Sequence, residues 1–150
     1  MTKYFYIMSF ASLLFFSVIN VAQEKEHFNR TEKNSADTPA HLVFENIENG
    51  IAKGNVSSIS RFFSSQIYLS LSNGISGYYS SNQAYYVLEE FFKMNRASTF
   101  KFSDMQEDEG SVYATGEYNF TSKSKRESAQ VYVSIKHSGK KWKITQITIN

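Results

Sequence analysis

Among the side chains able to do acid–base chemistry, no two form a recognisable catalytic pair. Asp104 follows Phe100 and Phe102 at the spacing of one strand face, so it is the carboxylate expected to point inward. Glu117 alternates the other way and is expected to be solvated. A carboxylate serves as a base near neutral pH when burial raises its pKa, which needs an enclosed site. The sequence shows no such site, so Asp104 is a weak candidate and no catalytic residue is predicted.

Motifs for metal binding, nucleophilic catalysis and phosphate binding are missing from the sequence. His27, His41 and His137 lack the spacing of metal ligands, and His41 stands four residues before Glu45, as in an ion pair along a helix. The chain has no cysteine, which excludes disulfides, thiolate metal sites and a cysteine nucleophile. Neither a Gly-x-Ser-x-Gly elbow nor a glycine-rich phosphate loop occurs. We therefore predict no metal and no cofactor.

Aromatic side chains are the main resource for binding, since they make up 16% of the residues. The candidates to line a cavity between helices and sheet are Tyr68, Tyr79, Tyr86, Tyr118 and Trp142. Such residues are core by default, but a cavity that they line would suit a small apolar ligand. Tyr113 and Tyr132 are expected on the opposite sheet face, where they offer a contact for a homodimer.

Basic residues gather in the last two predicted hairpins. They are Lys123, Lys125, Arg126, Lys136, Lys140, Lys141 and Lys143. Such a cluster could bind an anionic polymer or membrane surface, or it could protect strand edges from pairing with other chains. Edge protection is the favoured interpretation. The net charge of +2 is too small to predict nucleic-acid binding.

Three helices are predicted from apolar spacing and capping residues. The first opens at residues 38–39, carries apolar residues at 40, 44, 47 and 51, and ends at Gly54. Asn55 caps a shorter helix with apolar residues at 56, 59 and 63. Ser80 and Gln83 have the spacing of a capping box, which predicts the start of the third helix.

Strands fill the rest of the chain. Residues 67–71 and 75–79 alternate around a tight turn, and from residue 98 onward the apolar period is two through four further strands. Residues 142 and 144 differ in parity from 147 and 149, so we predict a β-bulge near residues 145–146. The order is ααββαββββ. Early helices followed by an antiparallel meander indicate the α+β class.

The N-terminal region has the features of an exported protein. Lys3, an apolar run over residues 4–18 and Ala22 predict a cleavable signal peptide over residues 1–22. A retained membrane anchor is the alternative, disfavoured because no basic stop-transfer cluster follows. Residues 23–37 are expected to be a flexible polar spacer and residues 38–150 one domain. We expect a periplasmic or secreted protein with no membrane span after cleavage.

Three segments resemble a family of exported Bacteroidota proteins known as a domain of unknown function. They are residues 47–63, residues 85–92 with their Leu-Glu-Glu-Phe-Phe run, and the closing Gly-Lys-Lys-Trp-Lys-Ile at 139–144. The element order is similar to the nuclear-transport-factor-2-like (NTF2-like, or cystatin-like) fold, which implies a curved antiparallel sheet wrapped around three helices. That fold hosts isomerases, dehydratases, carriers and interaction modules, so it does not define the activity.

Two functional hypotheses follow from these observations. The first is an exported, non-catalytic binding or interaction module that binds a small apolar ligand in its cavity or associates with itself through the sheet. The second is a small cavity enzyme, similar to isomerases or dehydratases, that uses a buried carboxylate. An ionisable side chain inside the cavity would favour the enzyme, and an apolar lining would favour binding.

Overall fold

The structure is a computed structural model that describes residues 39–122 and 124–150. The predicted signal peptide (1–22), the spacer (23–37), the helix cap at residue 38 and Lys123 lie outside the described residues.

Three helices form where spacing and caps predict them: α1 (Pro39–Ala52), α2 (Val56–Ser60) and α3 (Ser81–Met94). Asn55 caps α2, since its side chain accepts a hydrogen bond from the Ser58 amide. At α3, the Ser80 hydroxyl accepts from the Gln83 amide while the Gln83 side chain accepts from the Ser80 amide. This reciprocal pair is the predicted capping box, and it sets where α3 begins.

Six strands complete the predicted order: β1 (Phe63–Leu71), β2 (Ser76–Ser80), β3 (Arg96–Asp108), β4 (Ser111–Ser122), β5 (Lys125–Ser138) and β6 (Lys141–Ile149). Phe63, which apolar spacing assigned to the second helix, instead begins β1. The reason is that α2 stops at Ser60 and the Phe63 backbone lies opposite Ile144 of β6. The order ααββαββββ is confirmed.

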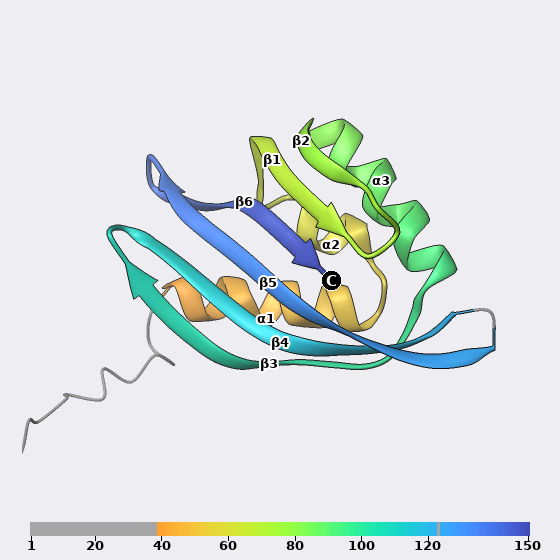
Figure 1. Cartoon of the computed structure of the whole chain (residues 1–150). Coiled ribbons are helices and arrows are strands. Elements are labelled where there is room, and N and C mark those ends of the chain that lie inside the picture. The colour runs from red at the N-terminus through yellow and green to blue at the C-terminus, as the bar shows by residue number, and fades with distance from the viewer. Residues whose placement is uncertain (1–38, 123) are drawn as a thin grey trace, which may run out of the picture. The chain divides into compact units, whose positions relative to one another are not determined.

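The strands form one curved, unclosed sheet in the order β2-β1-β6-β5-β4-β3 (Figure 1). Neighbouring strands are antiparallel except for β1 and β6, which run parallel. The predicted meander is present as β3 to β6. The parallel pair was not predicted, and it joins the β1–β2 hairpin to the meander.

The helices lie on one side of the sheet (Figure 1). We call the other side, which no described helix covers, the open face. The core lies between helices and sheet, and Ile47 of α1, Leu88 of α3 and Val133 of β5 are all fully buried there. Trp142, one of the aromatic residues expected between helices and sheet, is only partly buried against this core.

The β-bulge predicted near residues 145–146 is present. Ser134 lies opposite Gln146 while the next residue, Ile135, lies opposite Ile144, so Thr145 is the extra residue. Because of this residue, the isoleucines at 144, 147 and 149 are all fully buried despite their different parity.

Candidate functional site

Asp104, the weak catalytic candidate, is exposed. The cause is a second β-bulge: Phe102 lies opposite Gly116 and Asp104 lies opposite Thr115, so Ser103 is an extra residue that reverses the strand parity. The Asp104 carboxylate therefore does not follow Phe102 toward the helices. It accepts a hydrogen bond of 2.7 Å from the side chain of Gln106. Glu117 is exposed, in agreement with its parity.

Tyr118 is the only one of the five aromatic candidates whose side chain is fully buried. Its hydroxyl donates a hydrogen bond of 2.5 Å to the carbonyl oxygen of Asn95, at the end of α3. Burial raises the pKa of Tyr118 above its ordinary value, so the side chain is a neutral donor under ordinary conditions. The residue contributes to the core and links it to the end of α3.

The other four aromatic candidates lie in different surroundings, so the five together do not line one cavity. Tyr79 and Trp142 are partly buried against the core. Tyr86 is 61% exposed on α3. Tyr68 lies on the open face, because its neighbours in β1, Ile67 and Leu69, are the buried ones.

The described histidines do not form a metal site. His41 and Glu45 form the predicted pair on α1, with 3.1 Å between Nε2 and Oε1. The His137 ring stacks against the Trp142 ring, with 3.7 Å between centroids. Within residues 39–122 and 124–150, no three histidine, aspartate or glutamate side chains gather closely enough to hold a metal ion.

A cleft of about 620 Å³ lies between α1 and the edge strand β3. Its apolar part contains the rings of Phe44 and Phe102, which meet edge to face at 5.4 Å. Glu48 accepts a hydrogen bond of 2.8 Å from the Phe102 amide, so α1 satisfies a backbone donor at the free edge of the sheet. The carboxylates along the cleft (Glu45, Glu48 and Asp104) are not buried, so the cleft holds no buried acid–base pair.

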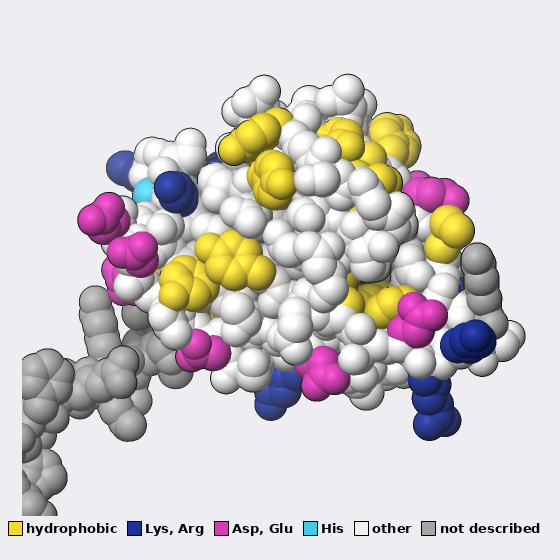
Figure 2. All heavy atoms as spheres, viewed as in Figure 1, with side chains coloured by type: hydrophobic (Ala, Val, Ile, Leu, Met, Phe, Trp, Pro, Cys, Tyr) yellow, Lys and Arg dark blue, Asp and Glu magenta, His cyan; other side chains and the backbone are white. Residues whose placement is uncertain are grey.

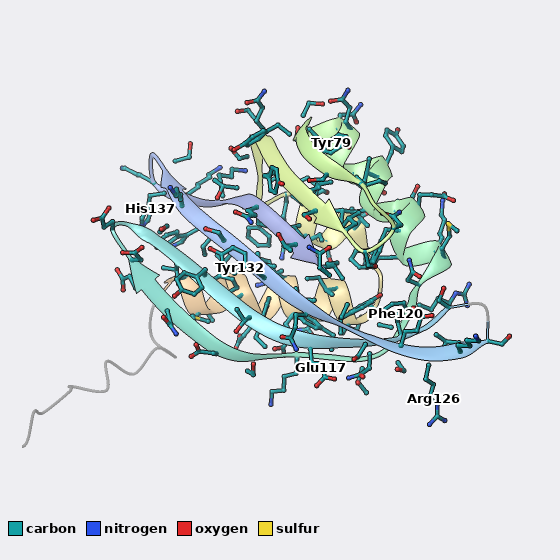
Figure 3. All side chains as sticks on the ribbon, viewed as in Figure 1. Tyr79, Glu117, Phe120, Arg126, Tyr132 and His137 are labelled. Atoms are coloured by element: carbon teal, nitrogen blue, oxygen red, sulfur yellow. The ribbon has the colours of Figure 1, made fainter. Side chains whose placement is uncertain are left out.

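Two pairs of tyrosines stand on the open face. Tyr68 of β1 and Tyr78 of β2 meet edge to face, with 5.2 Å between ring centroids. Tyr113 of β4 and Tyr132 of β5 are stacked at 5.4 Å with 28° between their planes. Tyr132 lies over the middle of the sheet (Figure 3). These pairs place aromatic surface on both sides of strand β6.

A row of residues crosses the strands between the two pairs: Tyr78 (β2), Tyr68 (β1), Gln146 (β6), Ser134 (β5) and Tyr113 (β4). Adjacent strands are about 4.8 Å apart, so Tyr68 and Tyr113 stand about 14 Å apart. The smaller side chains of Ser134 and Gln146 leave a depression between them. The resulting groove has a volume of about 450 Å³ and is lined by Gln66, Tyr68, Tyr78, Ser111, Tyr132, Ser134, Lys136, Thr145 and Gln146.

Charged side chains lie mainly around the perimeter of the open face, while the surface between its hydrophobic patches is uncharged (Figure 2). Lys136 is the one charged residue in the groove lining. The interior of this face is therefore both aromatic and close to neutral.

The predicted basic cluster is divided between two ends of the sheet. Lys125 and Arg126 begin β5, whereas Lys140 and Lys141 follow its end. Figure 3 shows Arg126 and His137 at opposite ends of this strand. Strand β6 pairs with β5 only over residues 131–138, so the start of β5 with Lys125 and Arg126 is a local edge of the sheet, and β1 pairs with β6 only from Ile144 onward. Edge protection, the favoured interpretation, therefore stays a prediction. The second basic turn also lies beside the acidic β3–β4 turn, since Ser111 lies opposite Lys136.

A curved, unclosed sheet around three helices places the domain in the NTF2-like class. An NTF-2-like protein of unknown function from Shewanella oneidensis has a TM-score of 0.53 at 12% identity, covering 72% of this chain and 93% of that chain. A ketosteroid isomerase-like protein from Catenulispora acidiphila, in complex with trimethylamine, has a TM-score of 0.58 at 10% identity, covering 72% and 83%. These likenesses show the fold alone.

The chain belongs to the DUF4783 family, a domain of unknown function, whose match covers residues 44–150. A DUF4783 family protein from Bacteroides uniformis has a TM-score of 0.64 at 17% identity, covering 71% of this chain and 94% of that chain. The family and fold predicted from the sequence are thus confirmed. No curated protein matches the chain. In the part of the chain that the structure describes, none of the helices has the length and apolar character needed to cross a membrane.

Tyr78, Ser134 and Gln146 were not among the sequence candidates, although they complete the groove with Tyr68. One signal was available: the alternation of β1 places Tyr68 opposite in direction to Ile67 and Leu69, away from the core. The row of residues across the strands exists only because β1 pairs with β6, and no local sequence pattern predicts that pairing.

Proposed function

We propose that this domain is a non-catalytic binding module that makes its contacts through the open face of the sheet. The observation that supports this most directly is the contrast between the two sides. On the helix side, the space is filled by core residues, and no Asp, Glu, His, Lys or Arg among the described residues is buried. A base whose pKa is raised by burial, as the enzyme hypothesis requires, has no counterpart there.

The open face has the properties of a contact surface instead. Tyrosine combines a large rigid ring with a hydrogen-bonding hydroxyl and costs little conformational entropy when it is immobilised. Four tyrosines stand on this face, and Tyr78 is 73% exposed. Occupants compatible with this surface include a second copy of the chain, through Tyr113 and Tyr132, or a different molecule. A small apolar ligand between helices and sheet has less support, because Tyr118 and its neighbours fill that space.

A fragment screen by ¹H–¹⁵N NMR tests the proposal, since binding surfaces attract small fragments. We expect fragments to shift amide signals of β1, β5 and β6 on the open face, and Tyr132→Ser to weaken these shifts. Tyr86→Ser is the matched control, because Tyr86 is an exposed tyrosine on α3. Shifts confined to the α1–β3 cleft or to core residues would contradict the proposal. Shifts in the cleft would instead favour a role for its carboxylates.

The N-terminal sequence supports a further part of the proposal, that the module works outside the cytoplasm. This part depends on the signal-peptide pattern of residues 1–22 alone.

A further inference from the structure

We infer that the groove of the open face binds a neutral oligosaccharide of roughly three hexose units, lying across the strands between the two tyrosine pairs. The inference rests on the proposed function, because it assigns a ligand class to the same face. It depends on three observations: aromatic rings at both ends of the groove, a polar floor between them, and very little charge.

Two of the four tyrosines, Tyr68 and Tyr113, are held by hydrogen bonds before any ligand arrives, and Tyr132, which lines the groove, stacks on Tyr113. The Tyr113 hydroxyl donates a hydrogen bond of 2.5 Å to the side-chain oxygen of Gln106. The hydroxyls of Tyr68 and Ser76 are 2.9 Å apart and share a hydrogen bond. A hexose ring has an apolar face of C–H groups that packs on an aromatic ring. Rings that are already ordered lose little entropy when they make this contact.

The floor of the groove offers hydrogen bonds to hydroxyl groups. Gln66, Ser134, Thr145 and Gln146 present amides and hydroxyls along it. The Gln146 amide nitrogen donates a hydrogen bond of 3.2 Å to the Thr148 hydroxyl, which orients the amide. A sugar has hydroxyls around its edge and apolar faces above and below. Its two kinds of surface therefore correspond to the floor and to the tyrosines.

The charge of the groove argues against polyanions. Single-stranded nucleic acids and sulfated polymers bind where several cations follow the backbone. Lys136 is the only cation in this lining, and the acidic turn of residues 107–109 lies near it. An uncharged ligand needs no row of cations for its binding, and the acidic turn does not repel it.

A protein partner is less compatible with the polar floor. The strongest contacts between proteins are anchors seated in dry, apolar pockets. An apolar anchor placed over Ser134 and Gln146 would displace water from the Ser134 hydroxyl and the Gln146 side-chain oxygen without replacing its hydrogen bonds, which is costly. A ligand rich in hydroxyls replaces the water on that floor with equivalent partners.

The test is an NMR titration of the purified protein with the neutral trisaccharides maltotriose, cellotriose and laminaritriose. At least one should shift the amide signals of Tyr68, Ser134 and Gln146, with a Kd on the order of 1 mM. Tyr132→Ala should weaken this binding about tenfold or more, whereas Tyr132→Phe, which keeps the ring, should retain most of it. Tyr86→Ala should bind as the unaltered protein does. Thermal unfolding of each variant checks that the fold is intact.

Three outcomes overturn the inference. One is that no trisaccharide shifts open-face signals at about 10 mM. Another is that Tyr132→Ala binds as well as Tyr86→Ala does. The third is self-association that covers the open face and is abolished by Tyr132→Lys. If fragments or a second copy occupy the open face while sugars do not, only the saccharide inference fails. If the fragments also avoid this face, the proposed function fails with it.

Discussion

At the scale of single residues, the hydrogen bond from the Tyr118 hydroxyl to the Asn95 carbonyl, at the end of α3, can be tested by its effect on stability. Burial raises its pKa in the folded state, while in the unfolded chain the group has its ordinary value of 10.0. The neutral hydroxyl is therefore favoured by folding. Below pH 10 both states are protonated and this contribution is complete. As the pH rises above 10, the Tyr118 hydroxyl ionises in the unfolded chain while it is still protonated in the folded protein. The contribution to stability therefore falls progressively until the pH reaches the higher pKa of the folded state.

The variant Tyr118→Phe should isolate this effect. At neutral pH it should lower the free energy of unfolding by about 0.5–1.5 kcal/mol, because the hydrogen bond to the Asn95 carbonyl is lost. Above pH 10 the difference between the two proteins should shrink, since only the wild type loses the Tyr118 contribution. Urea unfolding at neutral and alkaline pH measures the difference. The two proteins differ only at residue 118, so a difference that stays constant with pH would refute the assignment.

At the scale of elements, the Ser103 bulge depends on a glycine in the neighbouring strand. A Cβ added at Gly116 would lie 2.3 Å from the Lys101 carbonyl oxygen and 3.0 Å from the Phe102 Cα. These are backbone atoms, which cannot move aside as a flexible side chain would. The β4 strand therefore requires glycine here for β3 to approach so closely.

Gly116→Ala should destabilise the domain by about 1–3 kcal/mol, the usual cost of overpacking. Its neighbour Thr115→Ala should change stability by less than about 0.5 kcal/mol, because that side chain is only partly buried and points the other way. Chemical denaturation measures both, and hydrogen exchange should show that β3 loses protection first. If the two variants were equally stable, β3 could move away from β4 without a loss of folding free energy, and the prediction would be wrong.

The two basic hairpins lead to a prediction about anionic surfaces. Because Lys125 and Arg126 lie at the opposite end of β5 from Lys140 and Lys141, the four cations cannot act as one patch. Replacing either pair by glutamine should therefore change retention on heparin only slightly, with the usual weakening by salt. Replacement of Lys125 and Arg126 should speed aggregation on mild heating, because β6 pairs with β5 only from Val131 onward and leaves the start of β5 without a strand on that side. Loss of retention at low salt from one pair alone would identify that hairpin as an anion site.

Local signals were sufficient to predict the order of elements but not their long-range pairing. Ser80 with Gln83 predicted the start of α3, and the parity change after residue 144 predicted the Thr145 bulge. Each depends on a few consecutive residues. The Ser103 bulge was missed, and with it the true direction of Asp104, although a glycine within the partner strand is a known sign of irregular pairing.

The candidate site was less predictable than the fold. The groove draws its residues from five strands, so its existence depends on which strands are neighbours and in what register. Tyr113 and Tyr132 were expected on the face opposite the core, and the structure places them there as a stacked pair. Their partners across β6 could be found only once β1 and β6 were known to be adjacent.

At the scale of the whole molecule, the export proposal makes a simple prediction. Mass spectrometry of the protein from its native host should show a mature chain that begins at or near Gln23, because Ala22 has the small side chain that precedes a signal-peptidase cut. Soluble cytosolic protein that retains Met1 would contradict export. A membrane-bound form that retains Met1 would instead support the anchor.

The position of β6 has a consequence for how the domain is made. A ribosome synthesises the strands in chain order, and β6 is the last of these six to emerge, yet it lies between β1 and β5. Until it arrives, the β1–β2 hairpin and the β3–β5 meander share no strand pairing and cannot form one sheet. Closure of the sheet must therefore wait until β6 has been synthesised, and it brings together strands that are far apart in the chain. If the chain is exported as we propose, a secretion channel can thread it in this open state, before β6 closes the sheet.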